Sequence, residues 1–318
     1  MTVVIWASFV VLVVVLIALD LGVLHRRSSV IGARQALVFA AFWVALALAF
    51  NVYVYFLYEN NWLDWGVRSI LDLDGREAAL QFFTGYLVEF SLSVDNVFVI
   101  ATIFVYMRVP PQYQYRILFW GILGAIVLRG IMIGIGATLI HRFDWITYVF
   151  GAILIWSATR LMLVREDSFI PEEMLLVQLA RKFFTISPQL DNGKFFTVLA
   201  DGRRAATPLF VTLLMVEAAD VMFAVDSVPA IFAVTVDPFL VFTSNVFAIL
   251  GLRTLYFVVA GMMNRFRYLK VSLVFILGFV GLKMILSHHY PIPNLLSLGI
   301  IIAALLVGVI ASARATRN

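Results

Sequence analysis

The chain contains about nine stretches that are each long and apolar enough to cross a lipid bilayer as a helix. A spanning helix needs about 20 mostly apolar residues. Hydrophobic residues make up 63% of the sequence and charged residues 13%, about half the charged share of a soluble domain. We therefore predict an all-α membrane protein, with residues 1–318 forming a single polytopic transmembrane domain. The predicted spans are residues 2–24, 34–58, 79–107, 117–140, 145–164, 207–234, 238–263, 268–287 and 293–313.

Basic residues gather in alternate loops, which predicts the orientation of the chain. The connection 165–206 is the one long polar stretch, and it carries Arg181, Lys182 and Arg203 among other basic residues. We predict a short amphipathic helix at 172–184 and a turn at Asp191-Asn192-Gly193 within it. The opposite set of loops has only Arg68, Arg76 and Arg142. Because cytoplasmic loops are rich in Lys and Arg, we predict that 165–206 and the C-terminus are cytoplasmic and the N-terminus is outside. The basic residues form no single patch, so nucleic acid is not an expected partner, whereas the lipid bilayer is.

Part of the chain repeats itself. The segment Val88–Val97 resembles Ala219–Val228, and each has an acid six residues before an Asp. Downstream, Leu128-Arg129 matches Leu252-Arg253. Each unit contains three predicted helices, an odd number, so the second unit must run through the membrane inverted. Inverted repeats with a site at their interface are a common plan for secondary transporters. The predicted units are residues 79–164 (helices 3–5) and 207–287 (helices 6–8), and the alternative is a chance likeness of two apolar helices.

Several acidic residues lie inside apolar segments. One carboxylate at the centre of a bilayer costs about 2.5–3.5 kcal/mol, and such residues mark ion or proton pathways by default. Helices 3 and 6 contain no His or Cys, so the available ligands are hard oxygen donors, which suit Mg²⁺, Ca²⁺ and Mn²⁺. The candidate metal ligands are Glu89, Asp95, Asn96, Glu217, Asp220 and Asp226. Candidate gate or counter-charge residues are Asp20, Ser93, Arg129, Arg253 and Ser227.

Helix geometry separates the acids of each motif. Residues six positions apart, such as Glu89 and Asp95, point about 120° apart on a straight helix. Two ideal helices therefore cannot place all the acids in one compact site. Either the helices unwind near the aspartates, or the acids form more than one site. Pro229 removes a backbone N–H and favours a break beside Asp226.

Two arginines, Arg129 and Arg253, lie near the middle of predicted helices and are repeat mates. We interpret them as counter-charges that keep the acids ionised when no metal is bound. The alternative is that their side chains extend to the membrane interface. Asp20 is either a gate ligand or a solvated acid at the membrane boundary. No phosphate-binding loop, zinc-protease motif or nucleophile elbow is present, so no enzymatic activity and no prosthetic group are expected.

The acidic segments resemble the TerC family of bacterial membrane proteins, and within it the Alx-like branch. The matching segments are Leu19–Arg26, Glu89–Asn96 and Glu217–Ala230, and the likeness extends over nearly the whole chain. The family is grouped with the LysE-type exporters. The resemblance implies efflux of Mn²⁺ from the cytoplasm across the bacterial inner membrane, with the acids named above as ligands and Mn²⁺ as the substrate.

Alternatives to Mn²⁺ efflux remain open from the residues. Ca²⁺ uses the same oxygen ligands, so Ca²⁺/H⁺ exchange is one alternative. Buried carboxyl groups can also carry protons, so transport could be coupled to a proton gradient. A membrane scaffold that transports nothing and assists the assembly or metallation of other proteins is an alternative of another class.

Overall fold

The computed structural model describes residues 2–20, 33–62, 73–163, 182, 185–187, 190–199, 202–259, 269–287 and 289–315. Eight helices in these ranges are long and apolar enough to cross a membrane, and a shorter apolar helix covers Val3–Leu19. The predicted all-α membrane fold is therefore confirmed. The shorter helix is α1 (Thr2–Leu19). The eight long helices are α2 (Ala33–Glu59), α4 (Gly75–Tyr106), α5 (Pro111–Arg142), α6 (Ile146–Leu163), α8 (Pro208–Phe232), α9 (Pro238–Val259), α10 (Leu269–Leu286) and α11 (Asn294–Ala315).

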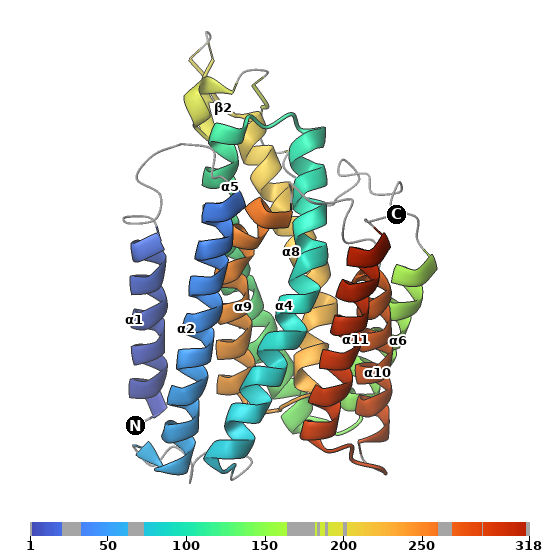
Figure 1. Cartoon of the computed structure of the whole chain (residues 1–318). Coiled ribbons are helices and arrows are strands. Elements are labelled where there is room, and N and C mark those ends of the chain that lie inside the picture. The colour runs from blue at the N-terminus through green and yellow to red at the C-terminus, as the bar shows by residue number, and fades with distance from the viewer. Residues whose placement is uncertain are drawn as a thin grey trace.

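The helices run side by side in one bundle (Figure 1). Helix α1 begins at the lower end of the bundle in this view, and α11 finishes at the upper end. Helix α1 therefore begins, and α11 finishes, at opposite ends of the bundle, as an odd number of spanning helices requires. Which end faces the cytoplasm stays a prediction from the loop charges.

Helix contacts follow a pattern that bears on the predicted repeat. Helix α4 packs on α9, α5 packs on α8, and α6 packs on α10. In the predicted repeat, α4 corresponds to α8, α5 to α9 and α6 to α10. If each helix is replaced by its counterpart, the α4–α9 contact becomes the α8–α5 contact, and the α6–α10 contact is unchanged. This exchange is what a pseudo-twofold axis would produce. The contacts are consistent with the repeat, which itself stays a prediction.

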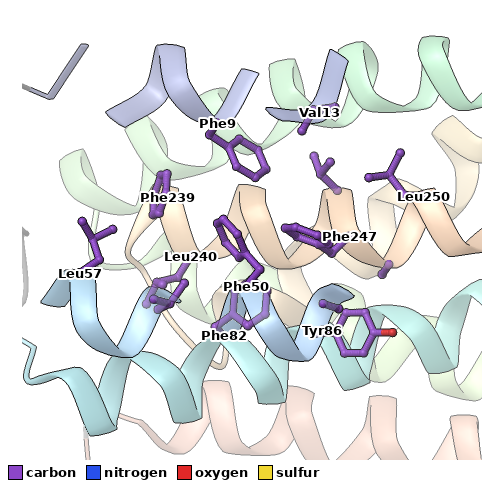
Figure 2. Close-up of a cluster of buried hydrophobic side chains, with 14 of the residues drawn as sticks. Phe9, Val13, Phe50, Leu57, Phe82, Tyr86, Phe239, Leu240, Phe247 and Leu250 are labelled. Carbon is purple, nitrogen blue, oxygen red and sulfur yellow. The ribbon is translucent and has the colours of Figure 1, made fainter. Parts of the chain in front are cut away.

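Aromatic side chains attach α1 and α2 to the helices of the predicted repeats. Phe9 of α1 and Phe50 of α2 lie among Phe82 of α4 and Phe239 and Phe247 of α9 (Figure 2). The ring centroids of Phe50 and Phe247 are 4.6 Å apart, and those of Phe9 and Phe50 are 5.5 Å apart. Both of these ring pairs are tilted, whereas Phe9 and Phe239 meet edge to face, an arrangement that stabilises packing beyond the area it buries.

The polar connection is folded where the structure describes it. A 3₁₀ turn covers Asp191–Gly193, at the turn predicted from Asp191-Asn192-Gly193. It is followed by an unpredicted hairpin of β1 (Phe196–Val198) and antiparallel β2 (Arg204–Ala206), with Phe196 opposite Ala206. Arg116 of α5 donates to the Gly193 carbonyl at 2.8 Å, which holds this segment on the start of α5. The predicted amphipathic helix at 172–184 lies outside the described residues apart from Lys182.

The predicted break beside Asp226 is wrong. Helix α8 continues from Pro208 to Phe232 with Pro229 inside it, and α4 is likewise unbroken from Gly75 to Tyr106. A proline this close to a helix end removes one hydrogen bond, and neighbouring helices can compensate for such a loss. Of the two predicted geometries, the structure therefore leaves the one in which the acids form more than one site.

Candidate cation site

Arg129 is the centre of a buried polar cluster. It lies in the middle of α5, and only 1% of it is exposed. A guanidinium group at this depth needs acceptors for its five N–H groups. The structure supplies them from the two helices that carry the repeated acidic motif, α4 and α8.

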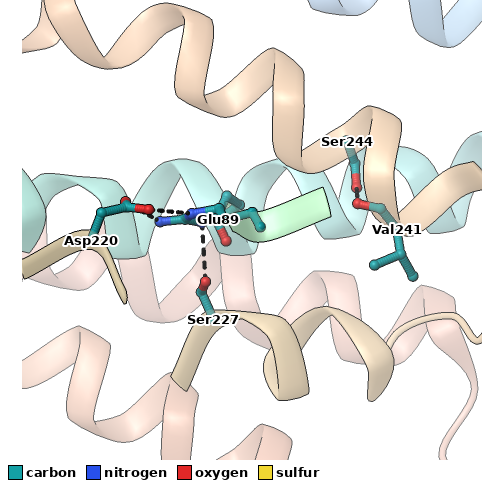
Figure 3. A network of polar contacts seen from close by, with 6 residues as sticks. Glu89, Asp220, Ser227, Val241 and Ser244 are labelled. Carbon is teal, nitrogen blue, oxygen red and sulfur yellow. Dashed lines mark hydrogen bonds and ion pairs between the residues drawn. The ribbon is translucent and has the colours of Figure 1, made fainter. Parts of the chain in front are cut away.

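Two carboxylates from different helices bind Arg129. Asp220 of α8 accepts from Nη2 at 3.0 Å and from Nε at 3.3 Å, and Glu89 of α4 accepts from Nη1. The Ser227 hydroxyl accepts from Nη1 at 3.1 Å. Figure 3 shows Asp220, Glu89 and Ser227 converging between their helices. The structure therefore joins three candidate residues that are 40 to 98 positions from Arg129 in the chain.

Asn96 extends the cluster along α4. In the amide orientation that satisfies both polar atoms, its oxygen accepts from Arg129 Nη2 at 3.3 Å and its nitrogen donates to the Leu92 carbonyl at 3.3 Å. Arg129 thus contacts oxygen atoms of four predicted site residues. It is not extended toward a membrane interface, so the counter-charge interpretation fits its position.

Two oxygen atoms beside the cluster are buried without a hydrogen-bond partner among the described residues. They are Oε2 of Glu89 and Oγ of Ser93, which is one helical turn further along α4. Unsatisfied buried oxygens are costly, because each has given up its hydrogen bonds to water. Residues four apart lie on the same helix face, so both oxygens belong to the side of α4 that carries Glu89.

Asp226 has different partners. Its carboxylate accepts a hydrogen bond from Ser157 of α6, which is buried. One turn beyond Ser157, the guanidinium carbon of Arg160 lies 5.6 Å from the centroid of the Trp156 ring. The second Asp of the α8 motif is therefore directed at α6, while the first acid is directed at α5.

Glu217 occupies a third position. A Cβ atom added to Gly124 of α5 would lie 2.0 Å from Glu217 Oε1, so the carboxylate packs directly on the bare backbone there. Its Oε2 is buried with no hydrogen-bond partner among the described residues. Glu217 and Asp220 are three residues apart on one face of α8, which makes Glu217 a neighbour of the Arg129 cluster.

The structure places the candidate ligands at several separate positions. Within the described ranges, no three His, Asp or Glu side chains gather closely enough to hold a metal ion. Asp95 is half-buried on α4, and Asp20 is buried at the end of α1. The side chain of Arg253 lies outside the description, so its predicted role stays a prediction.

Some buried polar residues escaped the sequence analysis. Ser157 binds Asp226, but a single Ser in an apolar helix carries no signal for such a role. Asn245 of α9 is fully buried and neither of its amide atoms has a hydrogen-bond partner in the described structure. An amide inside a predicted span is a signal that could have identified it.

Lys283 lies in the last turn of α10. It is 7% exposed, and its ammonium donates to Asn294 Oδ1 at 3.0 Å. The Asn294 amide donates in turn to Glu77 Oε1 at 2.6 Å. This chain of polar contacts attaches the start of α11 to α10 and α4.

Comparison with known proteins identifies the family. The sequence profile described as "Integral membrane protein TerC family" matches residues 74–318. A Myxococcus xanthus protein named "Uncharacterized membrane protein STKORF319" is 47% identical over 313 residues, covering 98% of this chain and 93% of that protein. The Escherichia coli K12 protein named "Putative membrane-bound redox modulator Alx" is 44% identical over 310 residues, covering 97% and 94%. No solved structure matches. On the extent of these matches, the chain belongs to the TerC family of integral membrane proteins.

Proposed function

We propose that the protein exports a hard divalent cation, with Mn²⁺ as its substrate, from the cytoplasm across the bacterial inner membrane. The observation that carries the proposal is the pairing of Glu89 and Asp220 around one buried position. These acids come from the two helices that hold the repeated motif. A site shared by two inverted units can be exposed to either side of the membrane in turn.

The donor atoms around that position suit a hard cation. Glu89 and Asp220 offer carboxylate oxygens, and Asn96, Ser93 and Ser227 offer neutral oxygens nearby. Oxygen-only ligand sets are preferred by Mn²⁺, Ca²⁺ and Mg²⁺, whereas Zn²⁺ and Cu²⁺ favour imidazole and thiolate. Asp226 with Ser157 and Glu217 at Gly124 supply further oxygens along α8, which can bind the ion on its way through the membrane.

Counter-transport of protons is the energy source that we propose. The chain has no phosphate-binding loop for ATP hydrolysis. Carboxyl groups that release a cation inside a membrane are favourable places for a proton, because protonation removes a buried charge.

The test is transport by the purified full-length protein in proteoliposomes. Wild type should accumulate ⁵⁴Mn when an imposed proton gradient drives the exchange. Glu89→Gln should reduce the rate by at least about tenfold, since one lost charge-assisted contact costs about 1.5–3 kcal/mol. Asp191→Asn, which removes an acid of the exposed Asp191–Lys194 pair, is the matched control and should transport normally. Equal rates for wild type, Glu89→Gln and empty vesicles would reject export.

The same experiment distinguishes Mn²⁺ export from two other candidate functions. Ca²⁺ exchange predicts that ⁴⁵Ca is transported in preference to ⁵⁴Mn. A membrane scaffold predicts no flux of either ion. The name of the Escherichia coli relative gives that protein a role in redox modulation. This chain contains no cysteine, so a redox role here would have to operate without thiol–disulfide exchange by the chain itself.

A further inference from the structure

We infer that Arg129 is an internal competitor of the transported cation. Its guanidinium holds the position between Glu89 and Asp220 that the cation takes, and it must leave these carboxylates before the cation can bind both. The inference rests on the proposed function. It adds a specific role for Arg129: setting the affinity and allowing release.

The first support is that Arg129 and a hard cation need the same atoms. The described side-chain partners of the guanidinium are oxygens of Glu89, Asp220, Ser227 and Asn96. Three of these four side chains were predicted as metal ligands from the sequence, and Ser227 as a gate residue. The guanidinium occupies acceptor sites on both carboxylates, and its positive charge repels a divalent ion at the same position, so the two cations compete there.

The second support is the charge balance at this position. Two carboxylates face a single guanidinium, so Arg129 neutralises only one of the two negative charges. The mismatch appears in the hydrogen bonds, because Glu89 Oε2 and Ser93 Oγ remain without partners among the described residues. A divalent ion would balance both carboxylates and could use these two oxygens. Replacing Arg129 by such an ion would therefore complete the charge balance of the two carboxylates.

The third support is the consequence for release. A divalent ion held by two carboxylates in a low-dielectric interior would dissociate slowly, because the interaction is strong there. A tethered guanidinium can return to the carboxylates as the ion leaves, which keeps a positive charge beside them throughout. Arg129 would then lower the affinity for Mn²⁺ and raise the rate at which Mn²⁺ leaves.

A purely structural role makes the opposite prediction. If Arg129 only joined α4, α5 and α8, removing it would leave two uncompensated carboxylates and loosen the helices. Binding of Mn²⁺ would then weaken together with stability. The two roles are separated by the direction in which the Mn²⁺ affinity changes.

The experiment measures Mn²⁺ binding to purified full-length protein in detergent, with transport in proteoliposomes as a second readout. Arg129→Gln should bind Mn²⁺ at least about tenfold more tightly than wild type, the effect of losing one competing charged contact. Its transport rate should fall, because release becomes slow. Arg129→Lys keeps the charge but not the fork of donors, so its Mn²⁺ affinity should lie between the two.

Adding free guanidinium to a variant that lacks the arginine side chain gives a second test. This test does not depend on comparing the stabilities of different variants. Millimolar guanidinium should weaken Mn²⁺ binding to Arg129→Gly and leave wild type unchanged. A folded Arg129→Gln or Arg129→Lys that binds Mn²⁺ equally or more weakly than wild type would overturn the inference while leaving export intact. Wild type that neither binds nor transports Mn²⁺ would overturn the proposed function and the inference with it.

Discussion

Asp220 of α8 accepts hydrogen bonds from Arg129 of α5 with both carboxylate oxygens, Oδ1 from Nη2 at 3.0 Å and Oδ2 from Nε at 3.3 Å. This paired contact fixes the plane of the guanidinium, because a carboxylate and an arginine fork match in geometry. The remaining nitrogen, Nη1, is thereby turned toward Glu89 and Ser227. The orientation of the whole cluster therefore depends on Asp220.

Asp220→Asn should disturb the site more than Asp220→Glu. An amide cannot accept on both sides, so Arg129 would lose one hydrogen bond and one compensating charge, worth about 2–4 kcal/mol of stability. Thermal unfolding in detergent and ⁵⁴Mn flux would both show the loss. Asp220→Glu, which keeps the charge, should retain more of both properties. Similar values for Asn and Glu would contradict the importance of the paired contact.

Gly124→Ala should displace the Glu217 carboxylate. The new Cβ would lie 2.0 Å from Oε1 and 2.5 Å from Oε2, so the side chain must move. We expect only a small loss of stability, because the atoms that must move are the end of a flexible side chain, together with slower Mn²⁺ transport. The matched control is Gly134→Ala in the same helix, where an added Cβ meets nothing within 4 Å. The control should be neutral or slightly stabilising, and equal effects of the two substitutions would refute the close contact.

Ser157→Ala tests whether α6 takes part in the path. The change removes the hydroxyl that donates to Asp226, at a cost of about 1–2 kcal/mol, and should slow Mn²⁺ transport. Thr159→Val is a suitable comparison, since the Thr159 hydroxyl is exposed and donates to the Ile155 carbonyl of its own helix. Normal flux in Ser157→Ala would place Asp226 outside the transport path.

Tyr58→Phe should make stability more dependent on pH. Burial raises the pKa of Asp237, which lies outside the spanning helices, above its usual value of 3.8, and the hydrogen bond from Tyr58 opposes that rise. The folded protein therefore binds a proton more tightly than the unfolded chain, and stability falls as pH rises from about 4 through the folded pKa.

Removing the Tyr58 hydroxyl raises that pKa further, so the destabilisation caused by Tyr58→Phe should be larger at pH 7 than at pH 4. Unfolding free energies at the two pH values provide the measurement. Tyr55→Phe, at a partly exposed tyrosine of the same helix, is the control and should change neither value. A destabilisation that is equal at both pH values would show that Asp237 does not titrate in this interval.

Local properties of the sequence were sufficient for the architecture. Hydropathy identified each of the long apolar helices that the structure describes, because a helix in lipid must satisfy its own backbone and present about 20 apolar residues. The same reasoning singled out Glu89, Asp220 and Arg129, since a charged side chain inside an apolar stretch costs free energy and therefore indicates a functional role. These conclusions depend on neighbours along the chain and require no knowledge of how helices pack.

The pairing of those charges was decided by the tertiary structure. Arg129 is 40 residues from Glu89 and 91 from Asp220, and only the rotation of α4, α5 and α8 about their axes brings the three together. The same rotations direct Asp226 to Ser157 and seat Glu217 on Gly124. Sequence alone allowed either an unwound single site or several sites. Side-chain packing between helices decided between these two arrangements. Helix α8 stays continuous past Pro229, and its acids contact different neighbouring helices.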